Sequence, residues 1–252
     1  DDPELEPDEA RIYRGVAARL NYMSPDRPDI AYAVKEAARD MSRPRQSSLK
    51  RLKKIGRYLI GRPRLVSRFR WQDEPDRITT FTDSDWAGDQ IGRKSTSGAL
   101  VQLGGHCIRS WSSTQSVIAL SSGEAEFYAI VKGASQSIGI QSMLKDLGYK
   151  FKIKMFTDAS TGKSIASRRG LGKVRHLDVS QLWVKTNQDG SIMLNKIKNT
   201  VNSSDCLTKH LDLASLQQRM EQLNMWHAEG RSEIAPELNC MKSSALKTKT
   251  IM

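Results

Sequence analysis

The sequence lacks a long hydrophobic run and has few cysteines. No stretch of about 18 apolar residues occurs among the 252, which excludes a membrane-spanning helix. The first ten residues (DDPELEPDEA) carry six acids and no base, so they do not resemble a signal peptide. Cys107, Cys206 and Cys240 are too widely spaced for a disulfide framework or a zinc site. We therefore expect a protein that is not secreted, located in the cytoplasm, including virus-like particles, or in the nucleus, without a membrane partner.

Positive charge is in excess and is unevenly distributed. The chain has 40 Lys and Arg against 28 Asp and Glu, a net charge of +12. Residues 11–70 hold seventeen of these bases against four acids, so this segment contains the whole surplus. An excess of this size indicates an anionic partner, most simply nucleic acid. The alternative is that the charge serves solubility alone.

Helical spacing dominates the first third of the chain. Apolar residues recur every three or four positions over 11–23, 29–41 and from about 47 onward, which predicts three helices. We interpret 1–10 as an acidic leader and 11–72 as a helical unit. The third helix carries bases on its outer flanks, which can contact phosphate or simply be solvated; these are Lys50, Lys53, Lys54 and Arg57.

From about residue 65 the pattern becomes that of an α/β domain. Strands and helices alternate, which predicts a mixed sheet with helices packed against it. A further amphipathic helix is expected from 211, followed by a disordered tail after Trp226. The predicted strands are 77–83, 95–103, 106–112, 151–158 and 191–197, and the predicted helices are 121–147, 160–168, 174–185 and one that opens at 203.

Acids stand at the ends of several of these elements. Asp83 and Asp158 each follow a Phe-Thr pair at the end of a strand, Glu124 and Glu126 begin the long helix, and Asp205 begins the last one. Reactive groups collect at the carboxyl ends of strands in α/β sheets, so these acids are expected to converge. Close carboxylates repel, and divalent cations that favour oxygen ligands, Mg²⁺ or Mn²⁺, relieve the repulsion. Taken singly, each acid is more simply a helix cap or a surface charge at a strand end, and it is their joint pattern that indicates a metal site.

Several motifs occur in a characteristic order along the chain. Together they resemble the ribonuclease H domain of copia-type LTR retrotransposon Pol polyproteins, preceded by the end of the reverse transcriptase. The ribonuclease H motifs are Phe81–Gly88 (FTDSDWAG), Arg93–Gly98 (RKSTSG), Ser110–Ser113 (SWSS), Ala119–Ala129 (ALSSGEAEFYA), Thr157–Asp158, Arg175–Asp178 (RHLD) and Ser204–Lys209 (SDCLTK). The reverse-transcriptase motifs are Tyr13–Tyr22 (YRGVAARLNY), Arg27–Ile30 (RPDI) and Arg57–Gly61 (RYLIG).

The resemblance implies a fold and a catalytic set. The fold is a ribonuclease H-like five-stranded mixed sheet with flanking helices over 76–210, preceded by a small helical segment. The catalytic and metal-binding acids are Asp83, Glu126, Asp158 and Asp205, which would hold two Mg²⁺ ions, with Mn²⁺ able to substitute. In the family pattern Asp83 bridges both ions, Glu126 and Asp158 hold the ion nearer the leaving group, and Asp205 holds the ion that activates water.

The resemblance also suggests residues that contact nucleic acid. His176 belongs to the Arg-His motif and is either a substrate contact or a packed core histidine. The loop 198–203 lacks the histidine that many relatives carry there, so another group would have to serve in its place. The predicted nucleic-acid-binding set is Arg93, Lys94, Ser95, Arg175, His176, Lys50, Lys53, Lys54 and Arg57.

The predicted activity is hydrolysis of the RNA strand of an RNA–DNA hybrid, with the rest of the retroelement polyprotein as a further partner. Polymerase activity is not expected, because the sequence has no Tyr-x-Asp-Asp motif. The alternative is a catalytically silent or domesticated fragment that only binds nucleic acid. A third reading, the same fold in another nuclease task, is disfavoured by the Arg93–Gly98 and Ser121–Glu126 strings.

Overall fold

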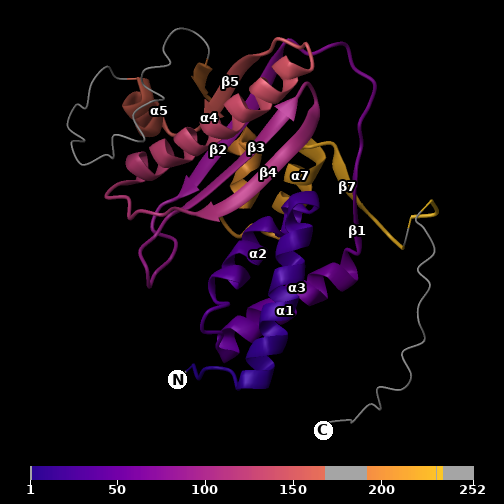
Figure 1. Ribbon diagram of the computed structural model, residues 1–252, viewed down its shortest axis with the longest axis vertical. Coiled ribbons are helices and arrows are strands. Elements are labelled where there is room, and N and C mark those ends of the chain that lie inside the picture. Colours follow the sequence, from indigo (N-terminus) through magenta and orange to yellow (C-terminus); the bar gives the residue numbers. More distant parts are fainter. Residues whose placement is uncertain (1, 168–191, 231, 235–252) are drawn as a thin grey trace.

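The computed structural model describes residues 2–167, 192–230 and 232–234 (Figure 1). A mixed β-sheet forms the middle layer. Helices α4 (Ser122–Asp146) and α5 (Ser160–Ser167) cover one face, while α2 (Pro28–Arg39) and α7 (Leu213–Gln222) pack on the other. This confirms the predicted fold class, a ribonuclease H-like five-stranded mixed sheet with flanking helices and a helical segment before it.

The sheet has the order β4-β3-β2-β5-β6. The first three strands along the chain form an antiparallel meander, and β5 and β6 add to it in parallel with β2. The carboxyl ends of β2, β5 and β6 therefore meet at one edge, which is where the acids stand. The strands are β2 (Arg77–Asp85), β3 (Thr96–Leu103), β4 (His106–Thr114), β5 (Lys152–Thr157) and β6 (Ile192–Lys196).

Three helices precede the sheet, as the spacing predicts. They share a core in which Tyr13 is fully buried and its hydroxyl donates to Ala37 O over 2.7 Å. Helix α1 (Pro7–Met23) begins four residues earlier than expected, because Pro7 is favoured at a first helical position and two acids follow it in the first turn. Leu5 is also buried in this core, so the acidic stretch is partly built into the helical unit. The third helix is α3 (Gln46–Gly61), and the turn Ser24–Asp26 is a 3₁₀ helix, η1.

A small second sheet was missed by the sequence analysis. Strand β1 (Arg64–Ser67) pairs antiparallel with β7 (Met225–Ala228), so the segment after Trp226 begins in a strand rather than in a disordered tail. The two strands are too short for a periodic signal, and each depends on the other for its hydrogen bonds. Their pairing brings the end of α7 beside the link between α3 and the main sheet (Figure 1).

Two glycines permit the close packing that forms the acid site. Gly98 lies opposite Asp83 in the β2–β3 ladder, and a Cβ on it would stand 2.7 Å from the Cβ of Leu207. Its missing side chain lets the 3₁₀ helix η4 (Ser203–Leu207) approach the sheet beside Asp83. Gly162 does the same for α5, since its Cβ would stand 2.6 Å from the Cβ of Glu126.

One further prediction differs in detail. The helix predicted to open at 203 is a short 3₁₀ helix, followed by α7 after a break at 208–212. The N-cap of α4 is Ser121, whose side chain accepts from Glu124 N. Another 3₁₀ turn, η3 (Asn199–Val201), lies between β6 and η4. The predicted helix 174–185 lies outside the described residues, and the domain boundaries at 72 and 210 remain predictions.

Candidate active site

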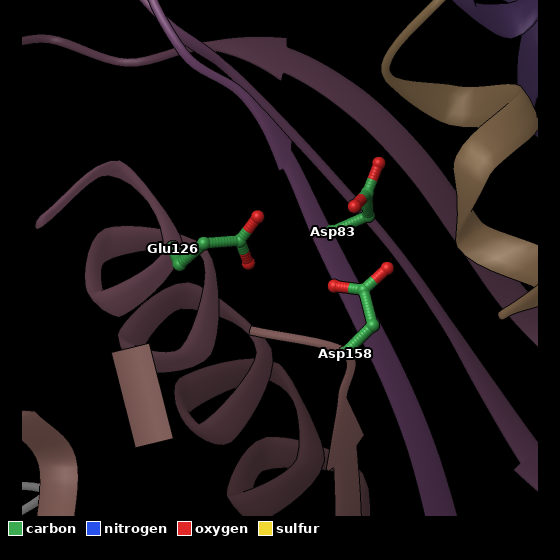
Figure 2. A group of neighbouring side chains, drawn as sticks. All are labelled: Asp83, Glu126 and Asp158. Atoms are coloured by element: carbon green, nitrogen blue, oxygen red, sulfur yellow. The ribbon is translucent and has the colours of Figure 1, made fainter. Parts of the chain in front are cut away.

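Three carboxylates meet at the sheet edge. Asp83 comes from β2, Glu126 from the first turns of α4, and Asp158 from the residue after β5 (Figure 2). One oxygen from each lies within 4.8 Å of the others. Figure 2 shows the three side chains turned toward a common space, which forms part of an open hollow of about 560 Å³. The structure therefore brings together three of the four acids that the sequence predicted.

Local hydrogen bonds hold two of the three acids, Glu126 and Asp83, in place. Glu126 accepts from Ser84 N over 3.2 Å and from the Thr157 hydroxyl over 3.5 Å, so its carboxylate is fixed between β2 and β5. The Thr208 hydroxyl donates a short hydrogen bond to Asp83 Oδ2. Asp83 is 4% exposed and Glu126 is 8% exposed, so neither relies on water for most of its solvation.

Burial and the charges of neighbouring acids make two of the three acids, Asp83 and Glu126, hard to ionise. Burial, with the nearby charges of Asp83 and Asp158, raises the pKa of Glu126 to about 9. Burial likewise raises the pKa of Asp83 to about 6, against the lowering effect of the Thr208 hydrogen bond. Among the described residues, no Lys, Arg or His forms an ion pair with Asp83, Glu126 or Asp158. A divalent cation would supply the charge that this oxygen-only donor set lacks.

Asp205 is not part of the three-acid group. Its two oxygens face cations instead, with Lys209 Nζ 3.0 Å from Oδ1 and Arg219 Nη2 3.1 Å from Oδ2. It nonetheless lies close by, because the Thr208 hydroxyl that donates to Asp83 also lies 3.2 Å from the Asp205 carbonyl oxygen. Its charge is one of the causes that raise the pKa of Asp83.

Two acids that lie two positions from Asp83 and Glu126 in the sequence have other environments. Glu124 accepts from Leu120 N over 3.0 Å and from the Tyr128 hydroxyl over 2.9 Å, which places it at the start of α4. Asp85 lies at the last position of β2. Neither Glu124 nor Asp85 belongs to the three-acid group.

Lysines that the sequence analysis did not single out border the hollow. Lys196 and Lys198 flank the carboxyl end of β6, and Lys209 follows η4. Since β6 is the parallel neighbour of β5, its end lies beside Asp158 by topology. The signal available in the sequence was a Lys-Ile-Lys string at the end of the last predicted strand.

The predicted nucleic-acid contacts divide into three groups. Arg93 is exposed and Lys94 is partly exposed, in the loop that follows β2. Ser95 differs from the prediction, because it is fully buried and its hydroxyl accepts from Ala87 N over 3.0 Å, so it braces this loop from inside. Arg175 and His176 lie outside the described residues. On α3 the predicted bases are all exposed, and these are Lys50, Lys53, Lys54 and Arg57.

Comparison with known proteins identifies relatives of this chain. The retrovirus-related Pol polyprotein from transposon RE1 of Arabidopsis thaliana is 30% identical over 81% of the chain, and that from transposon TNT 1-94 of Nicotiana tabacum is 30% identical over 78%. The chain is homologous to retrovirus-related Pol polyproteins. This confirms the predicted resemblance. The alignments span only 14% and 15% of those two relatives' lengths, and no protein-family model matches the chain.

Solved structures resemble the chain in fold. The foamy viral protease-reverse transcriptase in complex with dsDNA is 12% identical over 75% of this chain and 38% of its own, with a TM-score of 0.51. LC11-RNase H1, isolated from compost, is 15% identical over 53% of this chain and 93% of its own, with a TM-score of 0.39. Within the residues described, no helix combines the length and the apolar character needed to cross a membrane.

Proposed function

We propose that this chain is a metal-dependent endonuclease that hydrolyses the RNA strand of RNA–DNA hybrids during reverse transcription of a copia-type retrotransposon. The observation that carries the proposal is the three-acid group of Asp83, Glu126 and Asp158, in which Asp83 and Glu126 are buried and no acid has a cationic partner among the described residues. A carboxylate group of this kind at a strand edge suits metal-assisted phosphodiester hydrolysis. Homology to Pol polyproteins and the ribonuclease H-like sheet support the same reaction class.

The metal fits the donor set. We assign the ions as two Mg²⁺, replaceable by Mn²⁺, held by Asp83, Glu126 and Asp158, with Asp205 completing the set beside them. Bound there, divalent ions supply charge stabilisation for phosphoryl oxygens and lower the pKa of water. The chain's own contribution is orientation: Ser84 N and Thr157 direct Glu126 toward the shared space, and Thr208 directs Asp83.

Substrate binding is assigned to the basic surfaces. Lys196 and Lys198 border the hollow, Arg93 and Lys94 lie on the loop after β2, and the α3 bases lie on the helical unit. Together they would contact the two phosphate backbones and make binding salt-dependent. The foamy viral protein was solved with dsDNA, which accords with a duplex as the ligand. The rest of a retroelement polyprotein is the proposed macromolecular partner, within the cytoplasm, virus-like particles or nucleus.

A silent fragment that only binds nucleic acid is the second candidate. Cleavage of a labelled RNA–DNA hybrid by the purified chain, with Mg²⁺ and then with EDTA, separates the two. We expect cleavage with Mg²⁺ only, and its loss in Asp83→Asn with hybrid binding retained. Asp85→Asn is the matched control, because it removes the same charge two residues along β2 and should leave cleavage intact. Cleavage by Asp83→Asn at the wild-type rate would overturn the site, and a wild type that binds but never cuts would favour the silent fragment.

A further inference from the structure

Asp205 is a nearly buried carboxylate held between two cations of different character. Its side chain is 4% exposed, with Arg219 of α7 on Oδ2 and Lys209 on Oδ1. The Arg219 side chain is 10% exposed and that of Lys209 is 42% exposed. The same carboxylate therefore has one buried partner and one partner that reaches water.

Arg219 is anchored at several points. Besides Asp205, its guanidinium donates to Thr200 O over 2.6 Å, to Asn199 O over 3.5 Å and to Gln222 Oε1 over 3.3 Å. A planar guanidinium that serves several acceptors is fixed in direction. It thus ties α7 both to Asp205 and to the turn η3, which borders the acid site through Asn199.

Lys209 is held much more loosely. Its one ion pair among the described residues is with Asp205, four positions earlier in the chain. It lines the same hollow as Asp83, Glu126 and Asp158, and the charges of Asp83 and Asp158 act on it. A lysine that is 42% exposed can leave such a pair more readily than the nearly buried Arg219, because its ammonium recovers its hydration and Arg219 still pairs with the carboxylate.

We propose that Arg219 is a positioning residue, which holds Asp205 and the 199–201 turn at the acid site, whereas Lys209 occupies the place on Asp205 Oδ1 that a divalent cation takes. This inference rests on the proposed function, since it assigns roles around the same metal site. Because α7 supplies the anchor, the functional unit extends past residue 210 to at least Arg219.

The two cations make a matched experiment, because each variant removes one positive charge from the same carboxylate. The affinity of the full chain for Mn²⁺ is measured by isothermal titration calorimetry. Lys209→Met should bind Mn²⁺ a few-fold more tightly, since a competing cation is gone. Arg219→Met should bind it about 10–100-fold more weakly, the loss typical of outer partners that orient a metal ligand. If both variants bind more tightly, charge alone governs the site and the inference is overturned.

A second variant covers the case in which Arg219→Met does not fold. Arg219→Lys keeps the charge but not the guanidinium fork, and we expect weaker Mn²⁺ binding from it too. In an Asp205→Asn background the same change should have no further effect on Mn²⁺ affinity, because Arg219 acts through Asp205. Additive losses would mean that Arg219 has only a general structural role, and would overturn the inference.

A measurement on the metal-free protein completes the test. Hydrogen exchange at the amides of 199–202 should accelerate in Arg219→Lys and stay unchanged in Lys209→Met. Equal exchange in the two variants would contradict the anchoring role. A wild-type chain that binds no Mn²⁺ overturns the proposed function together with this inference. A wild type that binds Mn²⁺ while Arg219→Lys binds it equally well overturns this inference alone.

Discussion

Two acidic sites in the described part of the chain, the single acid Asp29 and the three-acid group, have opposite surroundings. Asp29 on α2 has a side chain with no exposure, and it accepts from Arg27 over 2.9 and 2.7 Å and from the Tyr58 hydroxyl over 2.9 Å, with His227 Nε2 at 3.2 Å. Asp83, Glu126 and Asp158 have no cationic partner among the described residues. Asp83 and Glu126 are buried much as Asp29 is, and Asp158 is partly exposed, but the balance of charge around the two sites differs.

The difference shows in the ionisation of these acids. Burial alone would raise the pKa of Asp29, but its hydrogen bonds and its pairing with Arg27 outweigh burial and lower that pKa. At the acid site nothing outweighs burial, and the pKa of Glu126 rises to about 9. A fully partnered buried acid joins segments, here α2, α3 and β7. An unpartnered group of acids is a site for a cation that comes from outside.

The largest expected effect on stability comes from the partnered group. Asp29→Asn leaves the buried Arg27 without its counter-charge, and we expect a loss of about 3–5 kcal/mol in the free energy of unfolding. Urea unfolding measures it. The control is Asp26→Asn, an exposed acid three residues away in η1, which should change stability by less than about 0.5 kcal/mol. If Asp29→Asn and Asp26→Asn both change the free energy of unfolding only slightly, Asp29 does not have the structural role that separates it from the three-acid group.

The second prediction concerns added metal. Mg²⁺ or Mn²⁺ at a hundred times its dissociation constant should stabilise the wild type by about 2.7 kcal/mol, because only the folded chain has the site. Thermal unfolding with and without the ion checks this. Asp83→Asn should lose the metal-dependent shift, whereas Asp85→Asn should keep it. A metal-induced shift that survives in Asp83→Asn would place the ion elsewhere.

The third prediction is a pH dependence of the metal-free protein. The folded chain retains the Glu126 proton up to about pH 9, while the unfolded chain releases it near pH 4.5. The folded state therefore binds more protons in this window, and its stability falls as pH rises, by at most about 1.4 kcal/mol for each pH unit from this group. Urea unfolding at several pH values should show this slope, reduced in Glu126→Gln and in the presence of metal. If the pH dependence of the unfolding free energy is unchanged in Glu126→Gln, it arises from other groups.

The smallest expected effect lies on the helical unit. Lys53→Gln with Lys54→Gln should weaken hybrid binding modestly and lower the steepness of its salt dependence by slightly under one unit per removed charge. Fluorescence anisotropy at several salt concentrations measures this. Lys145→Gln, at the exposed end of α4, is the control and should leave the salt dependence unchanged. If the salt dependence of hybrid binding is the same in the wild type, in the Lys53/Lys54 variant and in Lys145→Gln, α3 does not contact the duplex.

Much of the fold was predictable because its signals are local. The run of β-branched and aromatic residues in β2, and the long helical pattern after Ser121, each lie within one element. The β1–β7 pair was not predictable in the same way. Its strands are four residues each and lie about 160 positions apart, so neither carries a periodic pattern of its own. The motifs singled out Asp83, Glu126 and Asp158, each of which ends or begins a predicted element, and the structure brings these three acids together; their catalytic role stays a prediction.

The sequence by itself determined which acids stand at element ends, where the positive charge lies, and which family the chain resembles. The tertiary structure decided which of those acids share a space and which have partners. Asp205 has the same sequence setting as the others, yet it faces Arg219 and Lys209. The physical reason is that ionisation depends on what lies within a few ångström. Arg219, fourteen residues further along, reaches Asp205 only because α7 packs back against η4.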